Sequence, residues 1–249
     1  MYIHESTQQD IDQERRRLNM WQFKLLHVRD VRGIFMYDET GHPLYDKDKL
    51  PEMLHQIGCP LQVCAHKLTD FTNGQLLEAR EVFEASFGEI EREYIPTQLG
   101  MALVGHVSTG KTTFAVAALR RAAWRGYTVK FIDIENLSRF FTTWIELSSN
   151  AKEYDDYADR ADEWRRELWR MHMVYEVLVI DDIGRTKVPE FVYDELHSLL
   201  RSRTGNGCYT ILTANKTLTE FGALVGESSK DFIRREFSVQ PFVAEDKVV

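Results

Sequence analysis

The sequence has few cysteines, no long apolar run and no excess of positive charge. Its 249 residues include three cysteines, an odd number too small for a disulfide framework, so we expect a reducing, cytoplasmic setting. No apolar run reaches the ~18 residues that span a bilayer, and the polar start MYIHESTQQD has no apolar signal core. The formal net charge of −8 excludes a general electrostatic attraction to nucleic acid but leaves room for local basic patches.

The apolar residues that are present follow a repeating order from residue 100 onward. Apolar segments of strand length alternate there with segments of helical periodicity. We expect strands at 100–104, 127–134, 176–181, 208–214 and 237–243, and helices at 111–125, 135–147, 151–170 and 189–203. Continuous apolar strands that alternate with helices indicate an α/β fold, with a parallel sheet covered on both faces.

The chain before residue 100 is expected to be mainly helical. Helical patterns cover residues 6–28, 51–58 and 73–94. Between the first two, residues 32–50 contain strand-like residues around the turn ETGHP, so we expect a hairpin there.

Residues 105–112 read GHVSTGKT, which fits the phosphate-loop pattern G-x-x-x-x-G-K-S/T. The segment follows an expected buried strand and opens an expected helix, which is the context that the motif requires. Glycine lets the backbone pass close to phosphate oxygens, so that successive N–H groups and the helix N-terminus face the anion. Lys111 then supplies a cation to the β- and γ-phosphates. The expected nucleotide-binding residues are Gly105, His106, Val107, Ser108, Thr109, Gly110, Lys111, Thr112 and Thr113.

Two further strands end in polar side chains that belong beside this loop. VLVIDDIG is apolar until it reaches Asp181 and Asp182, and ILTAN ends in Asn215. Ligands of open α/β sheets lie at the carboxyl ends of the strands. We therefore expect Thr112 and Asp181 to hold Mg²⁺, Asp182 to orient an attacking water, and Asn215 to reach the γ-phosphate or that water. The alternative for each is a strand-end turn, where Asp and Asn are common.

Together these motifs resemble those of the AAA+ ATPases. Residues 105–112 resemble Walker A, 177–182 resemble Walker B and 211–215 resemble sensor 1. The lead-in GCPLQVCAHKLTDF and the block VIDDIGRTKVPEFVYDELHSLLRSRTGNGCYTILTANKT are similar to the DnaC/DnaI helicase-loader and IstB-like ATP-binding group. This second resemblance extends over about residues 58–243.

The resemblance carries expectations about the fold. It implies an αβα P-loop NTPase core with a five-stranded parallel sheet and no clear C-terminal lid. It also implies that residues 58–249 form the AAA+ ATPase domain and that residues 1–57 form a small, mainly helical extension that binds a partner.

The resemblance also implies an activity. Proteins of this group are ATP-dependent loaders or matchmakers, so we expect an ATPase that uses ATP and Mg²⁺. The first hypothesis is a DNA replication protein that loads a replicative DNA helicase onto single-stranded DNA. The alternative is an IstB-like ATPase that assists a transposase.

An arginine from a neighbouring subunit completes the ATP site in this superfamily, which implies an ATP-dependent homo-oligomer. The stretch DFIRREF stands where that arginine is expected, and we favour Arg235 over Arg234. Hydrolysis would then depend on assembly, DNA or a partner. The expected catalytic residues are Lys111, Asp182, Asn215 and Arg235.

Two alternatives from other classes have less support. Four side chains have the chemistry of zinc ligands: His55, Cys59, Cys64 and His66. Their spacing is not C-x₂-C, and two small buried thiols explain the cysteines better. A small-molecule kinase would use the same phosphate loop, but the paired Asp181 and Asp182 together with Asn215 argue against it.

Two charged segments have competing interpretations. Trp169 and the arginines of residues 151–170 could contact single-stranded DNA by stacking and charge, but the same segment has the pattern of a helix packed on the core. The run ERRR at 14–17 is either a DNA or partner contact or a solvated helix face.

Overall fold

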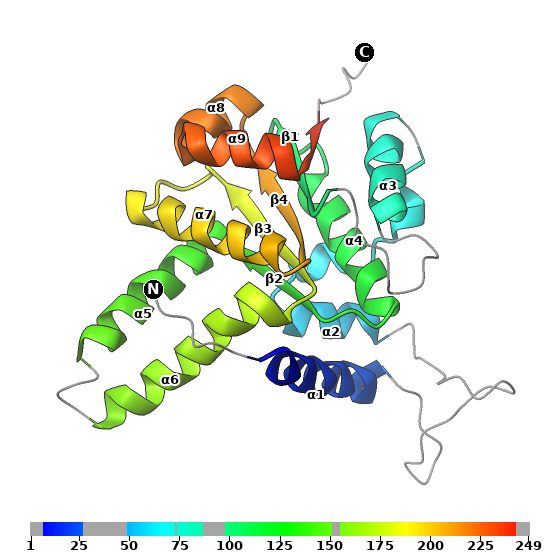
Figure 1. Ribbon diagram of the computed structural model, residues 1–249. Helices are drawn as coiled ribbons and strands as arrows, with labels where there is room; N and C mark the ends of the chain where they lie inside the picture. Colours follow the sequence, from blue (N-terminus) through cyan, green and yellow to red (C-terminus); the bar gives the residue numbers. More distant parts are fainter. Residues whose placement is uncertain (1–6, 27–48, 73, 87–97, 151–154, 243–249) are drawn as a thin grey trace, which may run out of the picture.

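The computed structural model of the protein describes residues 7–26, 49–72, 74–86, 98–150 and 155–242. At its centre lies a five-stranded sheet in the order β2-β3-β4-β1-β5 (Figure 1). The strands are β1 (Gly100–Gly105), β2 (Val129–Asp133), β3 (Val177–Ile183), β4 (Tyr209–Ala214) and β5 (Ser238–Phe242). All neighbouring strands pair in parallel, so the predicted α/β fold with five parallel strands is confirmed.

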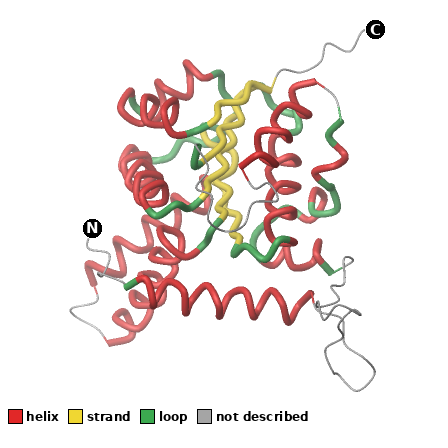
Figure 2. Tube along the Cα trace, turned by 45° about the vertical axis from the view of Figure 1, so that its right-hand side comes forward, coloured by secondary structure: helices red, strands yellow, loops and turns green. Residues whose placement is uncertain are grey.

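Helices cover both faces of the sheet (Figure 2). One face carries α2 (Leu50–Gln56), α3 (Gly74–Ser86) and α4 (Lys111–Trp124). The other carries α5 (Ile134–Asn150), α6 (Asp155–Trp169), α7 (Glu190–Gly205), α8 (Leu218–Val225) and α9 (Glu227–Glu236). Successive side chains of a strand point to opposite faces, so Met101 and Leu103 of β1 enter one buried cluster while Ala102 and Val104 enter the other. Burial on both faces explains why the strands are apolar without interruption.

The strand order brings three carboxyl ends together. β4 lies between β1 and β3, and Val104 pairs with Ala214 while Ile183 pairs with the same residue from the other side. The ladder between β3 and β4 shifts register between Ile180 and Ile183. The loops that follow β1, β3 and β4 therefore open at one edge of the sheet, and the irregular stretch of β3 contains Asp181 and Asp182.

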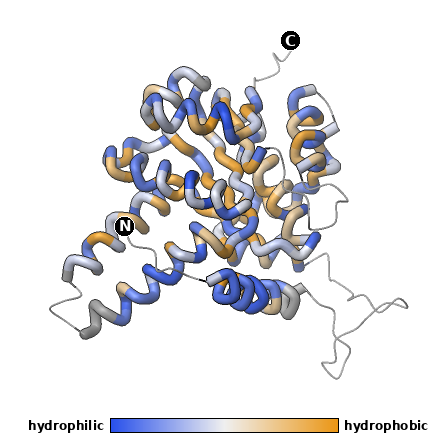
Figure 3. The backbone as a smooth tube through the Cα atoms, in the orientation of Figure 1, coloured by the Kyte–Doolittle hydropathy of each residue, from blue (hydrophilic) through white to orange (hydrophobic). Residues whose placement is uncertain are grey.

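The first helix, α1 (Gln8–Leu26), lies at the opposite edge of the sheet. Arg15 donates from Nε to the Val174 carbonyl at 3.1 Å and from Nη2 to the Met173 carbonyl at 3.0 Å. Glu14 accepts from Arg170 Nε at 2.8 Å. Since these partners precede β3, two of the charged residues in the run ERRR attach the helix to the body of the protein. Most of α1 is nevertheless hydrophilic, in contrast to α4 (Figure 3).

The predicted division into residues 1–57 and 58–249 stays a prediction. Leu50, Met53 and Leu54 of α2 are buried in the same cluster as the side chains of α4. Two short 3₁₀ turns, η1 (Leu61–Val63) and η2 (Leu68–Asp70), lead from α2 to α3. The expected hairpin within residues 32–50, apart from the start of α2, and the end of the expected helix 73–94 lie outside the described residues.

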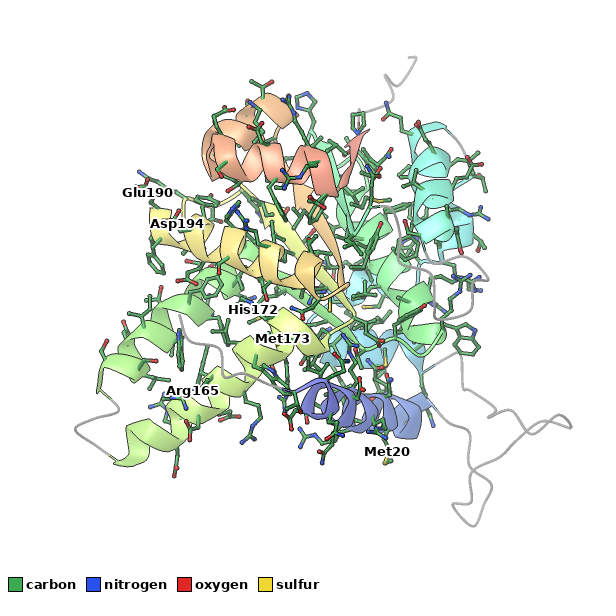
Figure 4. The ribbon with its side chains drawn as sticks, in the orientation of Figure 1. Met20, Arg165, His172, Met173, Glu190 and Asp194 are labelled. Atoms are coloured by element: carbon green, nitrogen blue, oxygen red, sulfur yellow. The ribbon has the colours of Figure 1, made fainter. Side chains whose placement is uncertain are left out.

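A π-helical turn, η3 (Arg170–Val174), follows α6 and was not predicted from the sequence (Figure 4 labels two of its residues, His172 and Met173). It packs around Arg203 of α7, a fully buried guanidinium. Arg203 donates to the Tyr175 and Tyr209 carbonyls at 2.9 and 2.7 Å and also to the Met171 carbonyl. This side chain therefore ties the turn to the start of β4.

Neither a metal cluster nor a membrane-spanning helix occurs in the part of the chain that the structure describes. No three His, Cys, Asp or Glu side chains converge there in a way that would hold a metal ion. Cys59 and Cys64 are free, buried thiols, and Cys64 Sγ lies 3.2 Å from the Pro60 carbonyl oxygen. No described helix is long and apolar enough to cross a bilayer.

Candidate nucleotide site

The loop between β1 and α4 has the backbone conformation of an anion cradle. Gly105 has φ 147°, and a Cβ at this position would lie 1.9 Å from the Phe242 carbonyl oxygen, so only glycine fits. Gly110 has φ 88° and is the N-cap of α4. A left-handed residue at this point turns the chain so that the first free N–H groups of the helix face the loop. Both glycines of the motif thus have positive φ, and their predicted contacts with phosphate stay predictions.

Lys111 folds back over this loop. Its Nζ donates to the carbonyls of Gly105 and His106 at 3.0 and 2.5 Å and to the Thr109 hydroxyl at 3.2 Å. The side chain is buried, and this burial lowers the pKa of Lys111, against the opposing effect of Asp182 and Asp181. A desolvated ammonium group inside an anion cradle is well placed to bind phosphate oxygens.

A hydroxyl and a carboxylate meet where Mg²⁺ was expected. The Thr112 hydroxyl lies 3.0 and 3.1 Å from the two carboxylate oxygens of Asp181. Burial raises the pKa of Asp181, while hydrogen bonds from Thr213 and Thr112 oppose this shift. Hard oxygen donors of this kind, few in number and close to bound phosphates, fit Mg²⁺. The donor set therefore agrees with the ion predicted for Thr112 and Asp181.

Asp182 follows Asp181 in the chain, and each of its carboxylate oxygens accepts one hydrogen bond. Oδ1 accepts from Asn215 Nδ2 at 2.7 Å, and Oδ2 accepts from Arg185 Nη1 at 2.7 Å. The residue has φ 60°, a left-handed conformation that costs free energy outside glycine. Its N–H donates to the Thr213 hydroxyl at 2.9 Å, which helps to maintain this conformation.

These side chains surround one cavity of about 550 Å³. Its walls are Val107, Ser108, Thr109, Gly110, Lys111, Thr112, Thr113, Asp182, Gly184, Arg185, Asn215 and Lys216. The structure thus brings together the predicted loop, Asp182 and Asn215, while Asp181 joins them through its bonds to Thr112. Their catalytic roles stay predictions.

The predicted trans arginine lies apart from this cavity. Arg235 is on α9, its side chain is 71% exposed, and its Nε donates to Glu236 at 2.7 Å. It does not line the cavity of its own subunit. Its contribution to the site of a neighbouring subunit stays a prediction.

The sequence did not single out two residues that touch the acidic pair. Thr213 donates to Asp181 and accepts from the Asp182 N–H. Arg185 forms an ion pair with Asp182. The sequence contains a signal for each residue. Thr213 stands two residues before Asn215 in ILTAN, and Arg185 follows Asp182 by three residues.

The helix α6, for which the sequence allowed a contact with single-stranded DNA, packs against its neighbour α5. The Trp164 ring lies 4.6 Å from that of Phe140, and Arg165 lies 5.7 Å from the Trp144 ring, so α6 packs along α5. Trp169 is half-buried. This favours the structural interpretation of that helix without assigning it a nucleic acid contact.

Comparison with known proteins agrees with this site. Residues 59–230 match the family described as IstB-like ATP binding protein. No curated protein matches the sequence. Because this match spans more than half of the chain, it does not rest on the phosphate loop alone.

Solved structures share the fold at low sequence identity. The DnaC helicase loader has a TM-score of 0.54 and 19% identity, covering 73% of this chain and 98% of its own. DnaI has a TM-score of 0.56 and 18% identity, covering 76% and 93%. The replication initiator DnaA bound to AMPPCP and single-stranded DNA has a TM-score of 0.52 and 18% identity, covering 70% of this chain but only 49% of its own.

The solved structures share the fold of this chain. The phosphate loop lines the cavity and also lies within the matched segment. The matched segment, 59–230, contains the phosphate loop, Asp181, Asp182 and Asn215. This chain belongs to the family of IstB-like ATP-binding proteins.

Proposed function

We propose that this protein is an ATPase that binds ATP with Mg²⁺ and uses the nucleotide to control the transfer of a partner protein to DNA. The observation that carries the proposal is the bond between Thr112 and Asp181 at 3.0 Å, at the edge of a phosphate-loop cavity. It joins the two motifs that an ATP-bound Mg²⁺ requires. Neither the phosphate loop nor the acidic end of β3 would by itself indicate a site for ATP with Mg²⁺.

The proposed chemistry assigns each residue one task. Lys111 and the loop N–H groups hold the phosphates, and Thr112 and Asp181 hold the ion, which when bound neutralises charge on the β- and γ-phosphates. Asp182 accepts a hydrogen bond from the attacking water and thereby orients it, and Asn215 holds Asp182 and reaches toward the γ-phosphate. Arg235 of a second subunit completes the site, so hydrolysis requires a homo-oligomer.

The first candidate partner is a replicative DNA helicase, which the protein would load onto single-stranded DNA. Its support is the similarity to DnaC and DnaI, which extends over 98% and 93% of those chains. The second candidate is a transposase, which is favoured by the IstB-like family match over residues 59–230. Both place the protein in the cytoplasm beside DNA.

The ATP site is tested by nucleotide binding and by hydrolysis. Lys111→Ala should abolish binding of a fluorescent ATP analogue, because the cation of the cradle is lost. Lys187→Ala, which removes an exposed lysine outside the cavity walls, is the matched control and should bind normally. Unchanged ATP affinity in Lys111→Ala would overturn the site assignment.

The partner is tested by co-purification. The tagged protein, with ATP and with ADP, is mixed with a purified DnaB-type helicase or with an IS21-type transposase. Retention of the helicase supports loading, and retention of the transposase alone supports the second candidate. Retention of neither would reject both partners while leaving the ATPase assignment intact.

A further inference from the structure

Lys216 is a second lysine, besides Lys111, in the wall of the nucleotide cavity. It directly follows Asn215, and its carbonyl accepts from the N–H of Gly105 at 2.9 Å. The backbone of Lys216 is therefore tied to the residue at which the phosphate loop begins. Lys216 is also half-buried, so its ammonium group has fewer positions than that of a lysine on an open surface.

The side chain of Lys216 lies against Gly184, in the turn that follows β3. A Cβ at Gly184 would lie 3.1 Å from Cγ of Lys216 and 3.5 Å from its Cε. The aliphatic part of the lysine thus crosses from the end of β4 to the end of β3, where Asp182 stands two residues before Gly184. Both strand ends belong to the edge of the sheet that carries the cavity.

The ammonium group of Lys216 has no ion-pair partner in the part of the chain that the structure describes. The carboxylate of Glu220 accepts from the Thr217 N–H and hydroxyl at 2.8 and 2.9 Å and caps α8. These hydrogen bonds lower the pKa of Glu220, and the charge of Lys216 contributes less to this shift. A cation without a paired carboxylate, in the wall of a cavity that fits phosphates, is available for an anionic ligand.

The two lysines approach the cavity from different elements. Lys111 begins α4 and donates to carbonyls of the phosphate loop, whereas Lys216 follows β4 beside Asn215. In the proposed site the loop holds the phosphate chain, and the strand ends with Asp182 and Asn215 face the terminal phosphate, which water attacks. Lys216 therefore lies on the side of the terminal phosphate.

We propose that Lys216 binds the γ-phosphate of the ATP in its own subunit, and that this contact makes the site prefer ATP over ADP. The proposal rests on the proposed function for the place of the nucleotide. An ammonium group and a phosphate oxygen form a charge-assisted hydrogen bond, which is stronger than a neutral one. ADP has no γ-phosphate, so this hydrogen bond is absent from its complex. No covalent bond changes when the contact forms.

The first experiment measures binding of AMP-PNP and of ADP, each with Mg²⁺, by calorimetry. Lys216→Met should weaken binding of AMP-PNP by about tenfold and leave the affinity for ADP unchanged, because a hydrogen bond to a charged group is lost from one complex only. Lys216→Arg keeps the charge and should retain most of the preference. Lys187→Met removes an exposed lysine outside the cavity walls, so this matched control should bind both nucleotides like the wild type.

Three outcomes would contradict these expectations. Equal losses for the two nucleotides in Lys216→Met would show a general electrostatic or structural effect and overturn the inference. An unchanged affinity for AMP-PNP would overturn it as well, and in both cases the ATP site itself would stand. A wild-type protein that binds neither nucleotide would instead contradict the proposed function, and this inference with it.

The second experiment locates the contact in the wild-type protein. An acylating reagent labels accessible lysine amines, and mass spectrometry of the peptides measures the extent of labelling at each lysine. AMP-PNP with Mg²⁺ should lower the labelling of Lys216 severalfold compared with ADP, because the γ-phosphate covers the amine. Labelling of Lys187 should be the same with both nucleotides. Equal labelling of Lys216 in the two complexes would overturn the inference.

Discussion

The hydroxyl of Thr112 lies 3.0 and 3.1 Å from the two carboxylate oxygens of Asp181, a residue 69 positions further along the chain. One group comes from the first turn of α4 and the other from the end of β3. Their contact depends on the packing of that helix against the sheet. The two halves of the proposed Mg²⁺ site are therefore assembled by the fold alone.

Thr213 should be needed for this assembly. Thr213→Val removes the hydroxyl that donates to Asp181 and accepts from the Asp182 N–H at 2.9 Å. We expect a loss of about 1–3 kcal/mol in the free energy of unfolding, because buried polar groups lose their partner. Since the Thr213 hydrogen bond lowers the pKa of Asp181, its loss should raise that pKa further, and more Mg²⁺ should be needed for ATP binding as the pH falls.

Urea unfolding and a Mg²⁺ titration of ATP binding at several pH values check this prediction. Thr142→Val, on the exposed side of α5, is the control and should change the unfolding free energy by less than about 0.5 kcal/mol. An unchanged Mg²⁺ requirement in Thr213→Val would show that this hydroxyl does not support Asp181.

Arg235 should act on the site of a neighbouring subunit. Arg235→Ala should leave ATP affinity unchanged and lower turnover by roughly 10³-fold, the contribution of an arginine supplied in trans. Turnover per subunit of the wild type should rise with protein concentration, and that of the variant should not. Arg234→Ala is the control from the same exposed end of α9 and should keep its activity.

Mixing two inactive variants gives a sharper test. Lys111→Ala cannot bind ATP but can supply Arg235, and Arg235→Ala can bind ATP but lacks the arginine. A mixture should recover part of the wild-type turnover. Failure to recover any turnover in mixtures that assemble would place the arginine elsewhere.

Arg203 should matter for stability and not for nucleotide binding. Arg203→Met removes the donors to three carbonyl oxygens and to the Thr210 hydroxyl, all of them buried. We expect a loss of about 3 kcal/mol in the free energy of unfolding, because these acceptors are left without partners. Chemical denaturation measures this loss. Arg201→Met, an exposed position on the same helix, should have a far smaller effect, and equal losses would contradict the prediction.

His172 should make the protein less stable in mild acid. Burial, together with the charge of Arg203, lowers the pKa of His172 to about 4, below the ordinary value of 6.5. Between these two values the unfolded chain binds more protons than the folded one, so stability is full above pH 6.5 and falls as the pH drops toward 4. The slope is about 1.4 kcal/mol per pH unit.

His172→Phe isolates this contribution. The phenyl ring fills a similar volume without a titratable group, so the free energy of unfolding should depend less on pH between 4 and 6.5 than in the wild type. Denaturation midpoints at several pH values across that window measure the difference. Identical pH profiles for the two proteins would mean that His172 titrates normally.

Local patterns in the sequence determined most of the elements. The strands and helices from residue 100 onward agree with the predicted segments within a few residues, because continuous apolar runs and helical periodicity report burial directly. The phosphate loop and the aspartates at the end of β3 were recognisable for a similar reason. Each is a short motif whose chemistry depends on neighbouring residues in the chain.

The tertiary structure decided what those motifs touch. Thr213 contacts Asp181 only because β4 lies beside β3. Arg185 contacts Asp182 because the chain turns after Asp182, which has a left-handed backbone conformation. In the sequence, Arg203 is one of several charged residues on a helix. Only the structure shows that it donates to a carbonyl of the π-helical turn. Packing between distant segments sets the strand order, the register and such turns. The periodicity of any one segment therefore does not predict them.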